Sequence, residues 1–194
     1  MGKSWKQFLT ISIWIAIVVF VLRCLLGWSD ISQAVNNKSV FTGAYAVFGY
    51  GGESIAVTTL IMLIFNKWAW RWKLINICTG KMPILAKKYA GTLTSDYDHI
   101  KRDAEIEVDQ TFLRVLIKMK TAESSSSTIC ASIEEIHNEP QLVYTYINEP
   151  RADIQDRSGI HYGTVMLKIS NPDVITGNYF TGRNTRGVLE LKKV

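Results

Sequence analysis

The stretch that decides the fold is DAEIEVDQTFLRVLIKMK, residues 103–120. Apolar and charged residues alternate in it with a period of two, which is typical of a strand with one buried face. Even-numbered positions 104–108 are apolar between acids, and odd-numbered positions 113–119 are apolar opposite Arg114, Lys118 and Lys120. A hairpin turning around Gln110 would place the acidic face beside the basic one, so the charges favour this antiparallel pairing and its register.

Further strand-like runs lie on both sides of this hairpin, separated by turn residues. They cover residues 86–94, 128–136, 141–149, 159–169, 174–181 and 186–193. Eight short sequential strands predict a small antiparallel up-and-down β-barrel, a closed fold without sheet edges that can hold one small ligand. A two-sheet sandwich is the alternative. The serine run Ser124–Ser127 is expected to be a polar loop.

The N-terminal part has a different character. Residues 7–26 form an apolar run of about 20 residues, enough for a helix to cross a bilayer, and Arg23 near its end can reach the interface. A second run covers residues 44–65. A signal peptide is the alternative for the first run, although the run is long and bulky for one. We therefore expect a transmembrane hairpin over residues 1–73, a linker over 74–84 and the barrel over 85–194.

The flanks of the two runs predict their orientation. Tryptophans and basic residues alternate over residues 67–73, as at a helix end held at a cytoplasmic interface. The loop expected at 27–43 carries only Asp30 and Lys38, whereas both outer flanks are basic. This charge distribution predicts that both termini are cytoplasmic.

Glu53 lies in the second run among Gly49, Gly51 and Gly52. Glycines let transmembrane helices approach closely, and a charged group inside a span is commonly functional, so Glu53 is a candidate for membrane assembly. The alternative is that the span begins later and Glu53 lies at the far interface.

Charge and composition exclude several function classes. The net charge of +5 divides into +6 for residues 1–83 and −1 for residues 84–194, so the chain is not expected to bind DNA or RNA through a basic domain. The three cysteines and three histidines show no metal-ligand spacing, and no metal or cofactor is expected. No hydrolase, P-loop or dinucleotide-binding motif is present, so we expect no catalytic residues.

A binding site is better supported, at GNYFTGRNTRG, residues 177–187. Guanidinium groups suit phosphates, hydroxyls and amides suit sugars and base edges, and an aromatic ring can stack on a base. If Ile175 faces inward, Gly177, Tyr179 and Thr181 share its face. Arg151, after the aromatic run that contains Tyr144 and Tyr146, is a further candidate. The alternative is that these aromatics are core residues and the arginines are solvated turn charges.

Two apolar spans, a linker and a β-rich domain ending in ITGNYFTGRNTRGVLEL resemble the two-transmembrane, β-strand-rich effector family of bacterial CBASS antiphage systems. The resemblance covers nearly the whole chain and includes the terminal pattern Gly177, Tyr179, Thr181, Arg183, Thr185, Gly187. It implies a receptor for a cyclic dinucleotide made by a cognate nucleotidyltransferase. Ligand binding would drive self-association, and clustered hairpins would disrupt the lipids of the bacterial inner membrane and kill the infected cell.

This interpretation assigns a role to each candidate residue. Arg151, Arg183 and Arg186 are expected to meet the phosphates, Asn178, Thr181 and Thr185 to read sugar or base edges, and Tyr179 or Tyr146 to stack. Two alternatives belong to other classes of protein. One is a membrane-anchored, lipocalin-like binder of a lipid or hydrophobic metabolite, and the other is a structural membrane adaptor.

Overall fold

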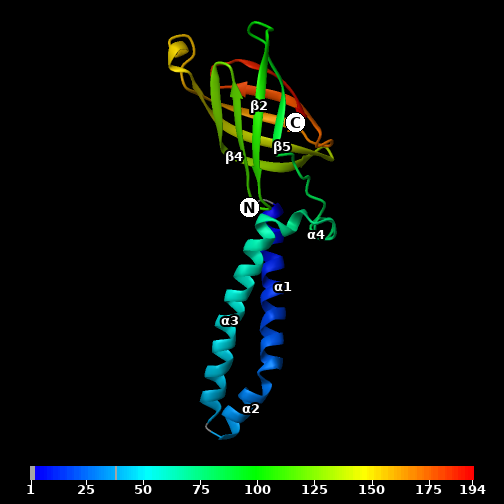
Figure 1. Cartoon of the computed structure of the whole chain (residues 1–194), viewed down its shortest axis with the longest axis vertical. Coiled ribbons are helices and arrows are strands. Elements are labelled where there is room, and N and C mark those ends of the chain that lie inside the picture. The colour runs from blue at the N-terminus through cyan, green and yellow to red at the C-terminus, as the bar shows by residue number, and fades with distance from the viewer. Residues whose placement is uncertain (1–2, 38) are drawn as a thin grey trace. The chain divides into compact units, whose positions relative to one another are not determined.

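The computed structural model describes residues 3–37 and 39–194, and its described residues form a helical unit up to Thr79 and a β unit from Gly80 to Val194 (Figure 1). Lys38, counted above in the charge of the loop, lies outside the described residues, as do residues 1 and 2. The helical unit consists of α1 (Lys3–Leu26), α2 (Trp28–Asn37), α3 (Val40–Lys67), η1 (Ala69–Arg71) and α4 (Lys73–Cys78). The β unit consists of β1 (Lys88–Ser95), β2 (Lys101–Gln110), β3 (Val115–Thr121), β4 (Ser124–Ile136), β5 (Glu139–Pro150), η2 (Ala152–Ile154), β6 (His161–Lys168), β7 (Val174–Thr181) and β8 (Arg186–Lys193).

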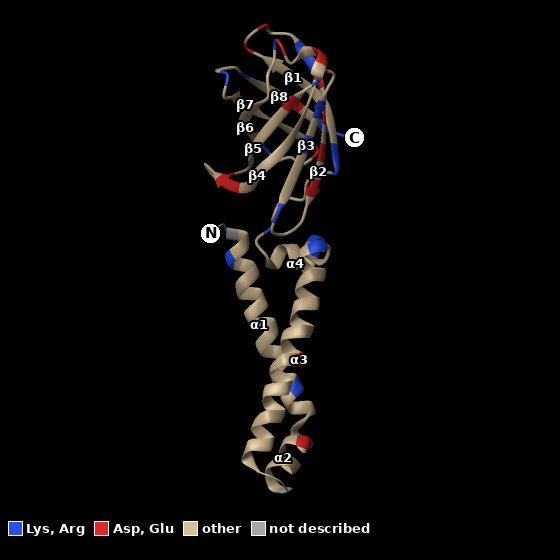
Figure 2. Cartoon of the chain, turned by 90° about the vertical axis from the view of Figure 1, so that its left-hand side faces the viewer, with Lys and Arg blue, Asp and Glu red and all other residues tan. Residues whose placement is uncertain are grey.

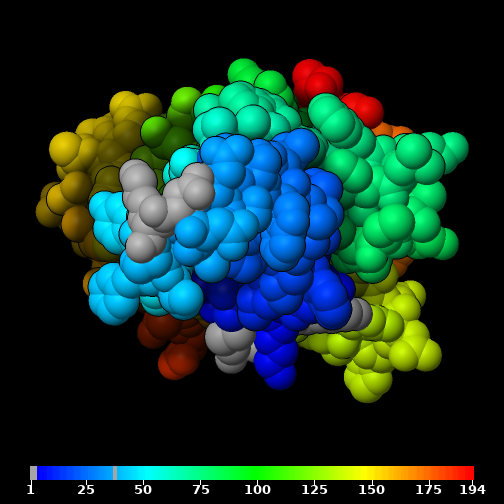
Figure 3. Space-filling model, turned by 90° about the horizontal axis from the view of Figure 1, so that it is seen from below, coloured from blue at the N-terminus to red at the C-terminus, as the bar shows by residue number. Residues whose placement is uncertain are grey.

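Helices α1 and α3 pack against each other, and both are long and apolar enough to cross a membrane by length and composition. Figure 2 shows that charged residues are sparse along both helices. The prediction of a loop at 27–43 is largely wrong, because α2 occupies most of this segment and packs against α3 (Figure 3). Glycine permits this packing, since a Cβ on Gly27 would collide with the Tyr50 ring and one on Gly43 with the Val35 side chain.

The tryptophans after α3 do not share one environment. Trp68 and Trp72 are exposed, whereas Trp70 is completely buried. The Arg71 guanidinium lies 5.2 Å from the centre of the Trp70 ring. Trp70 is therefore a buried residue, while the other two keep the exposure that an interfacial tryptophan needs.

The β unit confirms the predicted barrel. Its eight strands follow in sequence order, each antiparallel to the next, and β8 pairs with β1 to close the barrel. Glu105 lies opposite Lys120 and Glu107 opposite Lys118, which is the predicted charge-matched register. The turn itself lies at residues 111–114 and not around Gln110, because the Thr111 hydroxyl accepts the Arg114 backbone N–H and stabilises a turn there.

The serine run is a second correction. Ser124–Ser127 are not a loop but the start of β4, since their backbone pairs with β5 along the whole run and with β3 at residues 125–127. Small hydroxyl side chains fit on either face of the strand, and Ser126 is buried on the inner face. Double-sided pairing overrides the weak strand preference of serine.

The barrel interior is packed with side chains from every strand. Alternating positions of β2, β5 and β6 are buried, as the period-two pattern requires. Two inward glycines allow neighbouring strands to approach closely, because a Cβ on Gly91 would overlap the Glu190 carbonyl and one on Gly177 the Met166 carbonyl. The apolar core is formed by Tyr89, Ile106, Val108, Ile117, Met119, Leu142, Val165, Leu167, Ile175, Leu189 and Leu191.

The junction between β3 and β4 is the weakest part of the wall. Only Lys118–Lys120 pair with Ser125–Ser127 there, whereas the other junctions carry six or more residue pairs. Beyond these pairs, the pairing of β4 with β5 shifts register between Thr128 and Cys130. The Thr128 hydroxyl accepts the backbone N–H of Ile117 and donates to its carbonyl, both at 2.8 Å. From Cys130 to Ile136, β4 pairs with β5 alone among the described strands.

Candidate ligand site at the mouth of the barrel

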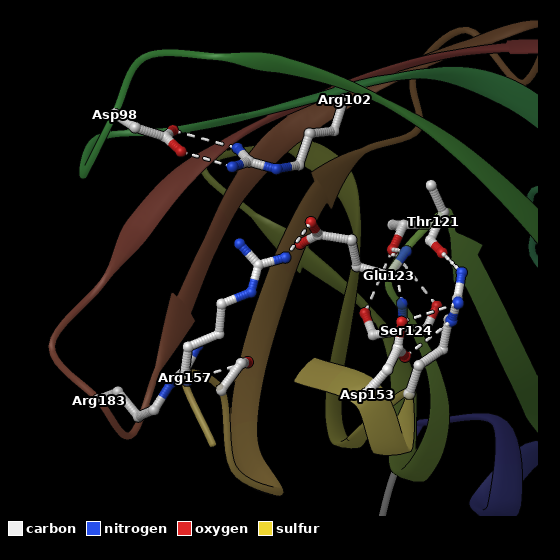
Figure 4. A network of polar contacts seen from close by, with 11 residues as sticks. Asp98, Arg102, Thr121, Glu123, Ser124, Asp153, Arg157 and Arg183 are labelled. Atoms are coloured by element: carbon white, nitrogen blue, oxygen red, sulfur yellow. Dashed lines mark hydrogen bonds and ion pairs between the residues drawn. The ribbon is translucent and has the colours of Figure 1, made fainter. Parts of the chain in front are cut away.

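Four connections form one end of the barrel, which we call the mouth. They join β1 to β2 (residues 96–100), β3 to β4 (122–123), β5 to β6 (151–160) and β7 to β8 (182–185). Polar side chains gather on them, and Figure 4 shows part of this network. The longest connection, 151–160, is tied to the 122–123 turn, because the Arg151 backbone N–H donates to the Glu123 carbonyl at 2.9 Å.

Below the mouth, polar groups line the inner face of β5. Tyr144, Tyr146 and Asn148 alternate inward, and Ser126 of β4 lies opposite Asn148. All four residues are buried, and the Tyr144 hydroxyl, in a residue only 2% exposed, has no hydrogen-bond partner among the described residues. Burial raises the pKa of Tyr144 and raises the pKa of Tyr146 to about 12, so both hydroxyls keep their protons at neutral pH. Buried polar groups are normally satisfied, so the Tyr144 hydroxyl is a group that awaits a partner.

Four arginines at the mouth are each paired with a carboxylate. They are Arg102 with Asp98, Arg151 with Asp153, Arg157 with Glu123 and Arg186 with Asp96. Arg102 is the most enclosed of them and donates to both oxygens of Asp98, as Figure 4 shows. Its hydrogen bonds lower the pKa of the Asp98 carboxyl to about 2. The backbone N–H of Arg186 likewise lowers the pKa of the Asp96 carboxyl.

Arg183 differs from these four. Its Nη1 donates to the neutral Ser158 hydroxyl at 3.0 Å, and no described carboxylate pairs with it (Figure 4). Its positive charge lowers the pKa of His161 in addition to the larger effect of burial, and it acts on Tyr146 in the same direction. A guanidinium near the tyrosines without an anionic partner is the group best placed to receive a phosphate.

The candidate residues predicted on β5, β7 and the β7–β8 turn lie in three places: the barrel interior, the mouth and the outer face of the barrel. Tyr146 and Tyr179 face the interior, and Ile175 is buried on the same face as Tyr179, as the parity argument required. Thr181 and Thr185 lie side by side at the mouth, with their hydroxyls 2.6 Å apart. Arg183 and Arg186 lie on either side of Asn184, whose backbone is left-handed in the turn. Asn178 is exposed on the outer face of β7, with its backbone paired to Met166 and Val188, so it does not face the same space as Tyr179.

Arg151 and Glu53 also have defined surroundings. The Arg151 guanidinium is exposed and donates to Asp153 and to the Ala122 carbonyl. In the helical unit, Glu53 of α3 accepts a 2.6 Å hydrogen bond from Arg23 of α1, and Arg23 also lies 3.8 Å from the centre of the Tyr50 ring. The Glu53 side chain remains 56% exposed.

Sequence reasoning did not select Arg102, Asn148 or Ser126. The alternation that predicted β2 could have found Arg102, because it continues from Ala104 back to position 102 on the same face. Asn148 could have been found in the same way from Tyr144 and Tyr146. Ser126 could not, because the serine run was assigned to a loop.

A closed barrel with an unpartnered tyrosine hydroxyl in its interior and arginines gathered at its mouth is typical of the class of small-ligand-binding β-barrels, here in a chain with two helices apolar enough to cross a membrane. Residues 80–193 match the family model described as Cap15, cyclic dinucleotide receptor domain. The whole chain is also 30% identical, over 203 aligned residues covering all of both proteins, to CD-NTase-associated protein 15 of Staphylococcus schleiferi. The chain belongs to the Cap15 family, which confirms the resemblance to CBASS effectors.

Proposed function

We propose that the chain is an antiphage effector of a CBASS system whose barrel binds a cyclic dinucleotide at its mouth. The observation that carries this proposal is the buried Tyr144 hydroxyl of β5, which lacks a partner among the described residues, together with Arg183 at the mouth, whose guanidinium is bonded to the Ser158 hydroxyl and to no described carboxylate. Membership of a family defined by a cyclic dinucleotide receptor domain supports the same ligand class.

The geometry supports separate roles for the arginines, the tyrosine rings and the buried polar groups of the site. Arg183 receives one phosphate directly, because only the Ser158 hydroxyl has to be replaced. A second phosphate competes with Asp98 for Arg102 or with Glu123 for Arg157. Tyr146 and Tyr179 offer rings for the bases, and Tyr144, Asn148 and Ser126 offer hydrogen bonds to base or sugar.

The effector step is membrane damage. In this proposal α1 and α3 cross the bacterial inner membrane with both termini in the cytoplasm, and ligand-bound barrels associate so that their hairpins cluster. A ligand that binds the associated form more tightly shifts the population toward it, so no enzymatic step is needed. Clustering would also cover the half-exposed Glu53, which is costly to leave in lipid.

Calorimetry of the full chain in detergent tests the ligand. We expect binding to at least one member of a panel of cyclic dinucleotides, accompanied by a larger assembly in light scattering. Fatty acids titrated in parallel test the lipid-carrier alternative. Binding of fatty acids with no binding across the nucleotide panel would overturn the proposal.

Arg183→Ala tests the site. Losing the guanidinium that has no carboxylate partner should weaken cyclic dinucleotide binding by roughly tenfold to a hundredfold, since a charge-assisted hydrogen bond contributes about 1.5–3 kcal/mol. Membrane insertion should be unchanged. The matched control is Arg114→Ala, an exposed arginine in the β2–β3 turn at the opposite end of the barrel. Equal affinity in the two variants would remove Arg183 from the site.

A further inference from the structure

The segment that follows α3 turns away from the direction of that helix. Helix α3 ends at Lys67, and the chain then passes through η1 before α4 begins at Lys73. The backbone of Trp72 is extended, with a ψ of 133°, and this separates the two short helices. Figures 1 and 2 show α4 lying across the end of the helix pair formed by α1 and α3. A helix in this orientation lies parallel to the plane of a bilayer that the pair crosses.

Large apolar side chains of this segment are exposed. The exposed fraction is 53% for Trp68 and 63% for Trp72, and within α4 it is 79% for Leu74 and 50% for Ile77. Leu74 and Ile77 are three residues apart, so they lie on the same face of α4. Several large apolar side chains exposed together on one short segment mark a surface that binds a membrane or another apolar partner.

The charge of the surrounding sequence selects the kind of partner. Between Glu53 and Asp96 there is no acidic residue, and the basic residues are Lys67, Arg71, Lys73, Lys81, Lys87 and Lys88. The Lys67 Nζ lies 4.6 Å from the centre of the Trp68 ring, so charge and apolar surface are adjacent. This combination matches an anionic bilayer, where acyl chains lie directly below phosphates. An apolar groove on a protein would not use the basic residues, and a nucleic acid would leave Leu74 and Ile77 in water.

We propose that residues 67–78 form an interfacial anchor that binds the headgroups of anionic phospholipids. The exposed apolar side chains enter the boundary between headgroups and acyl chains, and Lys67 and Lys73 extend to the phosphates. Only five residues separate α3 from α4, so a bilayer that α3 crosses is within reach of the anchor. This inference rests on the proposed membrane crossing and goes beyond it, because it identifies a second attachment to the membrane and the lipid class that the attachment requires.

Spin labelling of the full chain in vesicles tests the anchor. The native cysteines are first replaced, as Cys24→Ala, Cys78→Ser and Cys130→Ser. A nitroxide on Leu74→Cys should be reached severalfold better by oxygen than by a water-soluble nickel chelate in vesicles of phosphatidylcholine and phosphatidylglycerol. Vesicles of phosphatidylcholine alone should reduce this preference severalfold. Leu60→Cys, exposed on α3, is the lipid-facing control, and Asn178→Cys, exposed on β7, is the water-facing control.

Removal of charge provides a second test. Lys67→Gln combined with Lys73→Gln should lower the oxygen preference of the Leu74 label severalfold in vesicles that contain phosphatidylglycerol, because two contacts to phosphates are lost. The matched control is Lys101→Gln combined with Lys192→Gln, which removes two exposed lysines of the barrel and changes the net charge equally. The control should leave the label unchanged, and equal effects of the two double variants would overturn the anchor.

The remaining outcomes separate the anchor from the proposed membrane crossing. A Leu74 label that is open to water beside a Leu60 label in lipid overturns the anchor and leaves the membrane crossing intact. Water accessibility of both labels overturns the membrane crossing as well. Protection of the Leu74 label from both reagents means that protein covers this face, and equal immersion in the two kinds of vesicle means that anionic lipid is not required. Either result overturns the assignment to anionic phospholipids.

Discussion

The Tyr144 hydroxyl lies in an apolar interior without a partner among the described residues. Leaving such a group unsatisfied costs about 1–3 kcal/mol. Tyr144→Phe should therefore raise the free energy of unfolding by a similar amount in the absence of ligand, and weaken cyclic dinucleotide binding. Chemical denaturation and calorimetry measure the two effects.

Tyr89→Phe is the control for this prediction. The Tyr89 hydroxyl donates to the Pro172 carbonyl at 2.8 Å and accepts from the Ala86 N–H at 2.9 Å. Its loss should destabilise the fold by about 1 kcal/mol or more and leave binding unchanged. If both variants are destabilised alike, the Tyr144 hydroxyl has a partner and is not reserved for a ligand.

Asp98 makes stability depend on pH in the acid range. Its pKa is lowered from 3.8 to about 2 by Arg102, so the folded protein favours the ionised form. This contribution is complete above about pH 4 and disappears as the pH falls through 2. Asp98→Asn should flatten the loss of stability between these values, as followed by thermal unfolding at a series of pH values. An unchanged slope would mean that the Asp98–Arg102 pair contributes nothing in solution.

Strands and helices differ in how far the sequence determines them. Alternation predicted β2, β3 and their register, because one buried face imposes a period of two and opposite charges fix the pairing. The local preference of serine for loops gave a wrong prediction at Ser124–Ser127, where pairing with two neighbouring strands decides the structure. The prediction of a loop was also wrong at α2, because Gly27 and Gly43 allow a helix to pack there. Two of the arginine–carboxylate pairs, Arg157–Glu123 and Arg186–Asp96, join separate turns, and no local pattern contains that information.

Close contact between strands makes a prediction about β7. An alanine at Gly177 would place its Cβ on the Met166 carbonyl of β6, and backbone cannot move aside cheaply. Gly177→Ala should lower the free energy of unfolding by about 1–3 kcal/mol, measured by denaturant titration. Gly182→Ala is the control, because the nearest atom to its Cβ would be the Tyr162 carbonyl at 3.6 Å. Equal stability of the two variants would contradict the β6–β7 packing.

For the molecule as a whole, the proposed function assigns ligand binding to the β unit and membrane damage to the helical unit, and Glu53 tests this assignment. Glu53→Gln removes the partner of Arg23 and leaves a charge unpaired in an apolar helix pair. We expect ligand-triggered dye release from vesicles containing the full chain to fall severalfold, while cyclic dinucleotide binding stays unchanged. A loss of binding would show that the helices contribute to the site itself, and unchanged release would remove Glu53 from membrane assembly.

In the proposed site, the ion pairs at the mouth bear on how the barrel selects its ligand among the many phosphates of a cell. Each carboxylate beside an arginine is a competing anion that cannot diffuse away, and its effective concentration is at least of millimolar order. A metabolite with one weakly held phosphate has to overcome that resident competitor at every encounter. In the proposed site, a rigid ring with two phosphates would engage Arg183 and a paired arginine together, so the carboxylates would favour it over ligands with a single phosphate.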